Sequence, residues 1–232
     1  MKTGQNERPD GGIYTVRRAA RPPRLDGAWD DDAWNGANEA RIGCFRPESA
    51  DHRPDARVRV LFDDAALYVR FEVADRFVRS VQTEFNGPVC SDSCVEFFFQ
   101  PRPDRGYFNV EVNAGGTLLM SYVSDPGGPG RERRVERMPE GTDARLGIVH
   151  DLPVVVDPEL TGPVTWHIGY RLPLDLVAPW VGPLGSPAGQ EWRANFYKCG
   201  DRTSHPHWAS WQPVDALNFH LPHCFGRLRF EP

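Results

Sequence analysis

Residues 57–73, with the sequence RVRVLFDDAALYVRFEV, decide the fold class. Val58 and Val60 alternate with arginines, and the odd positions 67–73 are all apolar while residues between them are aromatic or charged. Strict alternation is typical of strands that bury one face. Residues 63–65, Asp-Asp-Ala, predict the turn between the two runs. The stretch therefore predicts a β-hairpin with one face in a core.

The same pattern continues along the chain. Further strands are predicted at residues 93–99, 107–113, 117–123, 145–150, 165–172, 191–198 and 225–230. Helical turns are expected only within residues 25–34 and 173–177, while 124–142 and 178–190 are expected to be loops. The 22 glycines and 22 prolines suit many strands joined by turns. We predict an all-β, antiparallel, jelly-roll-like β-sandwich of about ten strands with little helix.

Composition limits the possible partners. The 232 residues are 40% hydrophobic and 25% charged, as in ordinary globular proteins. Residues 1–12 are expected to form a flexible tail and residues 13–232 a single domain, because no linker divides them. With 27 basic and 32 acidic residues the net charge is −5, so we expect no nucleic acid partner and no membrane partner.

The cysteines and the N-terminal segment bear on the compartment. Five cysteines are an odd number, which is typical of free thiols. Residues 1–12, MKTGQNERPDGG, lack the apolar core of a signal peptide. We expect a cytoplasmic protein by default, or an extracellular one if the chain is a mature fragment. The oligomeric state is left open.

A polar row marks a candidate site. On strand 107–113 the side chains of Asn109, Glu111 and Asn113 share one face, about 7 Å apart, opposite an apolar face. The row is either a solvated outer surface or the floor of a ligand site. Glu96, on the preceding strand, lies beside it if it points the same way. Two amides and a carboxylate suit an uncharged polyhydroxy ligand better than a phosphate.

Other side chains extend or border this face. Arg193 and Asn195 either continue the polar face or pair with Glu96 and Glu111. Sugar rings have apolar faces and hydroxyl edges, so an aromatic plane beside polar groups suits them. Tryptophans usually lie in the core, and Trp29, Trp34 and Trp166 are expected there, whereas Trp208, Trp211 and Phe219 are better candidates for exposure.

The order of four motifs resembles a known family. They are LDGAWDDDAW at 25–34, VLFDDAALYV at 60–69, DSCVEFF at 92–98 and the tail from Trp211 to Leu228. Together they resemble the family 9 carbohydrate-binding modules over most of residues 13–231. The resemblance implies a β-sandwich with a sugar-binding slot between two aromatic walls. It also implies non-catalytic carbohydrate binding, by a module or a stand-alone domain, associated with glycoside hydrolases and polysaccharide breakdown.

The resemblance assigns roles to single residues. Glu96 matches the sugar-binding glutamate, Asn195 falls where a polar amide stands, and Phe219 falls where one aromatic wall stands. Cys90 stands near the position of the second wall, a tryptophan, so Trp208 is a candidate replacement. Glu111 falls where better-known members have an arginine. The resemblance also implies structural calcium, but the acidic turns at residues 30–32 and 63–64 single out no ligand.

Three alternatives stay open. Glu96 and Glu111 on neighbouring strands suit the acid and base of a glycoside hydrolase. Met120 and Lys198 are candidate axial ligands if the sandwich carries haem for electron transfer. A zinc site is conceivable at His205 and His207, or at His220, His223 and Cys224. We expect no nucleotide cofactor, because no glycine-rich phosphate loop stands between a strand and a helix.

Overall fold

The computed structural model describes residues 12–26, 29, 31–128 and 130–232. The predicted tail at residues 1–12 lies almost wholly outside them, and so does Asp30. The strands are β1 (Ile13–Arg18), β2 (Glu39–Ile42), β3 (Cys44–Phe45), β4 (Asp55–Phe62), β5 (Ala66–Asp75), β6 (Val78–Ser80), β7 (Cys94–Gln100), β8 (Tyr107–Asn113), β9 (Leu118–Asp125), β10 (Arg134–Arg137), β11 (Val149–His150), β12 (Val156–Leu160), β13 (Val164–Pro173), β14 (Glu191–Cys199), β15 (Trp208–Ser210) and β16 (Gly226–Phe230). The helices are η2 (Val89–Ser91), α1 (Thr142–Leu146), α2 (Leu174–Val181) and η3 (Pro222–Cys224).

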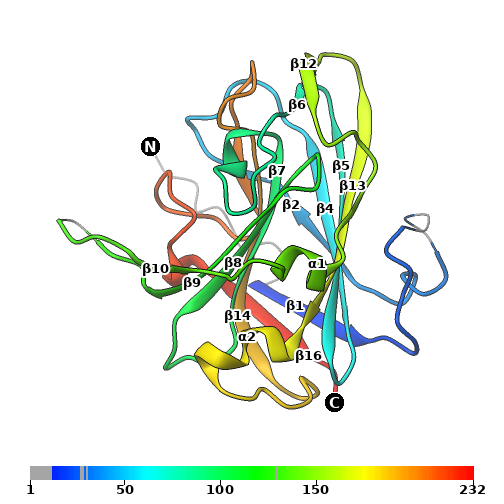
Figure 1. Cartoon of the computed structure of the whole chain (residues 1–232), viewed down its shortest axis with the longest axis vertical. Helices are drawn as coiled ribbons and strands as arrows, with labels where there is room; N and C mark the ends of the chain where they lie inside the picture. The colour runs from blue at the N-terminus through cyan, green and yellow to red at the C-terminus, as the bar shows by residue number, and fades with distance from the viewer. Residues whose placement is uncertain (1–11, 27–28, 30, 129) are drawn as a thin grey trace, which may run out of the picture.

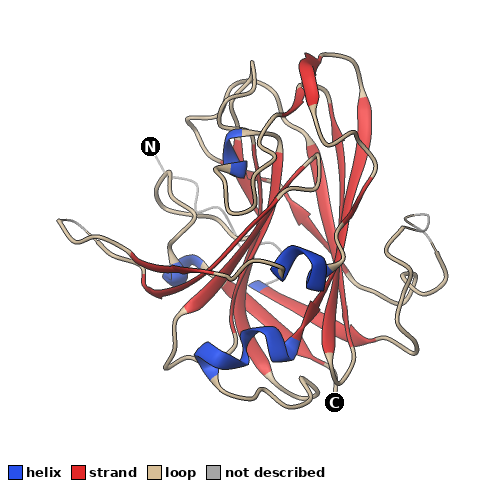
Figure 2. Cartoon of the chain, in the orientation of Figure 1, coloured by secondary structure: helices blue, strands red, loops and turns tan. Residues whose placement is uncertain are grey.

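Most strands form two facing layers of one curled sheet, and β6 pairs with β12 in a separate two-stranded sheet (Figures 1 and 2). One layer has the order β10-β9-β8-β7-β14-β16, and the other has the order β4-β5-β13-β11 with β2 beside β4. Strand β1 joins them, because its first four residues pair with β16 and its last two pair with β4. The predicted β-sandwich is confirmed. The structure differs in two ways: β1 runs parallel to both neighbours, and the strands outnumber ten because several are too short to show alternation.

The core lies between the layers, where the alternation placed it. The rings of Phe71 on β5 and Phe196 on β14 meet across it at 6.3 Å. Apolar residues of both predicted hairpin strands are buried there, and so is Trp166. Trp29 and Trp34 are buried too, as predicted. The expectation that Trp211 is exposed is wrong, because its ring packs 5.6 Å from that of Phe196 in the core.

Three segments differ from the prediction. The predicted loop 124–142 contains β10, which is exposed throughout and lacks an apolar face. The predicted strand 145–150 begins inside α1, which ends where Gly147 adopts a left-handed φ of 57°, and leaves only β11. The helical turn expected at 173–177 continues as α2, and Leu176, Val177 and Val181 are buried against the core.

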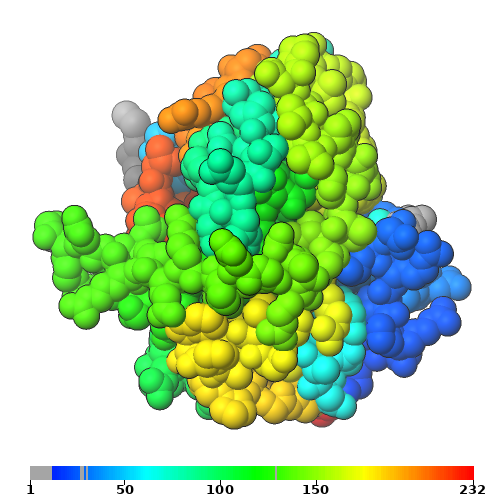
Figure 3. Space-filling model, in the orientation of Figure 1, coloured from blue at the N-terminus to red at the C-terminus, as the bar shows by residue number. Residues whose placement is uncertain are grey.

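An arm projects from the body of the molecule. Strands β9 and β10, with residues 126–128 and 130–133 between them, form this arm, seen in green at the left (Figures 1 and 3). Strand β10 is the edge of its layer and continues the sheet beyond β9. No helix within the described part of the chain has both the length and the apolar character to cross a bilayer.

Candidate ligand-binding site

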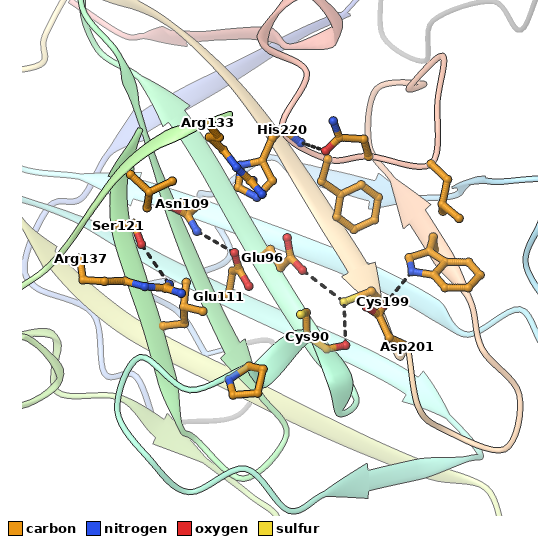
Figure 4. Close-up of a pocket in the computed structure, with 17 residues that line it drawn as sticks. Cys90, Glu96, Asn109, Glu111, Ser121, Arg133, Arg137, Cys199, Asp201 and His220 are labelled. Atoms are coloured by element: carbon orange, nitrogen blue, oxygen red, sulfur yellow. Dashed lines mark hydrogen bonds between the residues drawn. The ribbon is translucent and has the colours of Figure 1, made fainter. Parts of the chain in front are cut away.

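A cavity of about 520 Å³ opens on the outer face of β7, β8 and β9. Its floor carries Glu96, Asn109, Glu111 and Ser121, and η2 contributes Cys90 (Figure 4). Segments that are distant in sequence supply the sides. They are the arm, the end of β14 with the turn after it, the start of β15 and residues 217–220. The cavity therefore forms only when both the arm and the C-terminal segment pack beside the sheet.

The polar row of β8 does face away from the core, but it is not a solvated surface. Only 3% of Asn109 and 6% of Glu111 is exposed. A second apolar cluster with Phe98 and Phe225 packs on this same outer face and covers the strands beside the cavity. The surrounding segments shield the row from solvent. Polar groups at such depth are costly unless they have hydrogen-bond partners.

The two glutamates are direct neighbours across the strand pair. Glu96 on β7 stands opposite Glu111 on β8. Cys199 Sγ donates to Glu96 Oε1 at 3.2 Å, and Asn109 Nδ2 donates to Glu111 Oε1 at 2.6 Å (Figure 4). Burial, together with repulsion from Glu111, raises the pKa of Glu96 well above its usual range. Burial also raises the pKa of Glu111, although the Asn109 bond and two arginines oppose the shift. The pair therefore retains protons that an exposed pair releases.

One buried acceptor on the floor has no partner. Asn109 Oδ1 accepts no hydrogen bond from any described residue. An unsatisfied buried polar atom costs about 1–3 kcal/mol. A ligand hydroxyl that donates to this oxygen recovers part of that cost, so the floor is suited to a ligand rich in hydroxyls.

Two aromatic side chains border the cavity. Phe219 stands where the resemblance implied one wall, and Trp208 is the candidate replacement for the second wall. Phe219 stacks on Tyr197, with ring centroids 4.1 Å apart and planes 13° from parallel. Trp208 is half-buried, and its indole N–H donates to Asp201 Oδ1 at 2.7 Å. Both rings are fixed by these contacts and both line the cavity with Cys90. They offer flat apolar surfaces beside the polar floor.

Two of the predicted site residues do not reach the cavity. Asn113 donates to Asp92 and to the Gln82 carbonyl, and it accepts from the Thr117 N–H, so it holds loops at the end of β8. Asn195 is fully buried beneath residue 212, whose backbone N–H and carbonyl both bond its amide.

The expectations for Arg193 are also corrected. Its guanidinium donates to the Pro222 carbonyl and pairs with neither Glu96 nor Glu111. Parity along β14 predicted the outward direction of Arg193 and Asn195, but it carried no information on the C-terminal segment that covers them.

Several lining residues were missed at the sequence level, and His220 was considered only as a zinc ligand. Arg133, Arg137 and His220 point into the cavity from its sides, and Ser121 lies on the floor (Figure 4). Arg137 Nη1 donates to Ser121 Oγ at 3.2 Å across the β9–β10 pair. The available signal was the spacing of residues 133, 135 and 137, which puts them on one side of a strand. It was hidden because the segment was taken for a loop.

The structure does not support the haem alternative. Met120 is buried on the core face of β9. Lys198 is buried as well: its Nζ lies 2.7 Å from His207 Nε2, 2.9 Å from the Cys199 carbonyl and 3.4 Å from Asp75 Oδ2. Neither residue lines the cavity. A lysine held by three partners is not available as an axial ligand.

Only two of the predicted zinc ligands are brought together with a third potential ligand. His205 stacks on Phe77 at 3.6 Å, His207 bonds Lys198, and His220 Nδ1 lies 2.8 Å from the Tyr107 hydroxyl. His223 and Cys224 do come together, with Asp215 as a third potential ligand within 4.8 Å. A second group of this size consists of Cys94, Glu96 and Cys199, of which Glu96 and Cys199 line the cavity.

No group of His, Cys, Asp and Glu side chains in the described residues has the all-oxygen ligand set that calcium takes. Calcium takes six to eight oxygen ligands. Each potential metal group in the described ranges contains a single carboxylate beside thiols or an imidazole. In the acidic turn, Asp63 accepts from two backbone N–H groups and from the Tyr68 hydroxyl, while Asp64 pairs with Arg18. These carboxylates serve the turn, and no role is assigned to calcium.

The fold and the cavity define a β-sandwich ligand-binding module with a polar floor and aromatic sides. The chain belongs to carbohydrate-binding family 9, whose model matches residues 33–230. A structure from Bacteroides uniformis ATCC 8492, of a protein with a proposed carbohydrate-binding role, is 26% identical. It aligns with a TM-score of 0.81 over 94% of this chain and 99% of that chain.

Two further structures share the fold. They are of a family 9 carbohydrate-binding module from Caldicellulosiruptor kristjanssonii, in complex with cellotriose and with glucose. The first is 18% identical with a TM-score of 0.62 and covers 94% of this chain and 93% of that chain. The second is 17% identical with a TM-score of 0.60 and covers 94% and 95%. No curated protein matches this chain.

Proposed function

We propose that the cavity binds a mono- or oligosaccharide without cleaving it. The observation that carries the proposal is the combination of a hydroxyl-binding floor with two fixed aromatic rings, in a member of carbohydrate-binding family 9. The complexes of the Caldicellulosiruptor module with cellotriose and glucose support this choice of ligand. A role beside glycoside hydrolases in polysaccharide breakdown is part of the proposal.

The chemistry follows from the donors and acceptors of the floor. Asn109 Oδ1 accepts from a sugar hydroxyl. The protonated fraction of the Glu96–Glu111 pair both donates and accepts, which suits hydroxyls that do the same. Phe219 and Trp208 contact the apolar faces of the ring. Displacing water from these surfaces contributes the apolar part of the affinity.

Isothermal titration calorimetry with glucose, cellobiose, cellotriose and galactose tests the proposal. We expect one sugar class to bind, and Glu96→Gln to weaken it about tenfold, which is 1.4 kcal/mol. Glu191→Gln is the matched control, since Glu191 is an exposed residue of β14 remote from the cavity. A panel in which nothing binds at high millimolar sugar, with the protein folded by circular dichroism, contradicts the proposal.

The same variant, Glu96→Gln, also distinguishes sugar binding from the hydrolase alternative. Incubation with any oligosaccharide that binds, followed by chromatography, measures cleavage directly. We expect intact sugar with both the wild type and Glu96→Gln. Cleavage that the wild type shows and Glu96→Gln and Glu111→Gln both lose would make the chain an enzyme instead.

A further inference from the structure

The arm places two arginines along one side of the cavity. Arg133, Val135 and Arg137 line it, whereas Arg134 of the same strand does not. The hydrogen bond from Arg137 Nη1 to Ser121 Oγ holds that guanidinium beside the floor (Figure 4). Two cationic groups therefore stand where a ligand on the floor meets the edge of the sheet.

Their charge is not neutralised by a carboxylate at contact distance. Within the described ranges, ion pairs of the arm join Arg131 to Asp125 at 3.0 Å, and none joins Arg133 or Arg137 to an acidic side chain. Both arginines do act on Glu111, since their attraction opposes the rise of its pKa. Burial nevertheless keeps that pKa raised, so Glu111 carries less than its full negative charge near neutral pH.

Arg133 and Arg137 also act on His220, which lines the same cavity. The pKa of His220 is lowered to about 3 by burial and by repulsion from Arg133 and Arg137. Its imidazole is therefore neutral at physiological pH, with Nδ1 2.8 Å from the Tyr107 hydroxyl. The arm supplies the two cationic groups, the glutamates lie on the floor, and Asp201 lies on the side away from the arm (Figure 4).

We propose that this cavity prefers sugars with an anionic substituent, a uronate carboxylate or a phosphate ester, and that Arg137 and Arg133 bind that group. The inference rests on the proposed function and names its ligand class. A guanidinium binds carboxylate and phosphate oxygens through two parallel N–H donors, which a hydroxyl group cannot match. The sequence-based expectation of an uncharged ligand came from the β8 row alone, without these arginines.

Matched sugar pairs give the test. Calorimetry compares glucose with glucuronate, and galactose with galacturonate, in buffers of about 20 mM and 150 mM ionic strength, where screening differs. Glucose 6-phosphate is the additional ligand that distinguishes a preference for phosphate from a preference for carboxylate. At low salt we expect the better anionic sugar to bind about tenfold more tightly than its neutral partner, a difference of 1.4 kcal/mol. The preference should shrink at the higher salt.

Arginine variants show which side chain carries the preference for the anionic sugar. Arg137→Gln is expected to bring the ratio of anionic to neutral affinity close to one, with the affinity for the neutral sugar changed less than about threefold. Arg134→Gln, on the same strand but outside the cavity, is the control and should keep the wild-type ratio. Equal or tighter binding of the neutral sugars by the wild type overturns the inference while leaving sugar binding intact. So does an equal loss of the ratio in Arg134→Gln. No binding of any sugar is instead a failure of the proposed function.

Discussion

Two buried groups of ionisable residues lie on opposite faces of strands β7 and β14. On the core face, Lys198 contacts His207 and pairs with Asp75, whose side chain is fully buried. On the cavity face, Glu96 pairs in register with Glu111, and no cation contacts either carboxylate in the part of the chain that the structure describes. The same layer therefore carries a compensated buried charge on its core face and an uncompensated carboxyl pair on its cavity face.

The pKa shifts record the difference. Burial alone raises the pKa of Asp75, but the Lys198 ammonium and the His52 hydrogen bond hold it well below its usual range. The glutamates of the cavity shift the other way. A buried charge with partners stabilises the fold it belongs to, whereas like charges without partners lower stability and are retained where they serve a ligand. The direction of the pKa shift therefore distinguishes a structural ionic network from a candidate binding site.

The largest expected effect is on the core face. Lys198→Met leaves Asp75 buried without its cation, and breaking a buried pair costs about 3–5 kcal/mol of unfolding free energy. Urea denaturation measures it. The double variant Lys198→Met with Asp75→Asn is the control and should recover part of the loss. A loss below about 1 kcal/mol would mean that the pair is not compensated as described.

On the cavity face the expected effect has the opposite sign. A carboxyl whose pKa is raised on folding binds its proton more tightly in the folded state, so stability falls as pH rises from about 4.3 through the folded pKa. Glu111→Gln removes that dependence. We expect the variant to gain on the wild type between about pH 5 and pH 8, by on the order of 1 kcal/mol or more.

Urea denaturation at pH 5, 6, 7 and 8 checks this difference. The lowered pKa values of His207 and His220 make both proteins less stable as pH falls below about 6.5, and this contribution cancels when the two are compared. A difference that stays constant over the whole range would show that Glu111 titrates normally in the folded protein.

Much of this contrast was accessible from the sequence. Alternation along β8 predicted Phe108 in the core and Asn109 and Glu111 on the other face, but it left the direction of Glu96 conditional. The structure places Glu96 beside Glu111. Alternation cannot show what covers an outer face, which is why Asn113 and Asn195 were grouped with the site. Strand β10 was missed because an exposed edge strand needs no apolar side, and its arginines were missed with it. Lys198, which the sequence offered as a candidate haem ligand, is buried because Asp75 and His207 approach it from distant segments.

The smallest expected effect concerns an aromatic side of the cavity. Phe219 stacks on Tyr197, so Phe219→Leu keeps an apolar side chain but removes the flat protein ring that contacts the ligand. A ring contact contributes about 0.5–1.5 kcal/mol beyond burial, so sugar affinity should fall about threefold to tenfold. Calorimetry measures the affinity, and Leu217→Ala, which truncates an exposed apolar residue of the same rim, serves as the control. If Leu217→Ala weakens binding as much as Phe219→Leu, the rim contributes apolar area alone, and the stacked ring adds nothing specific to a sugar face.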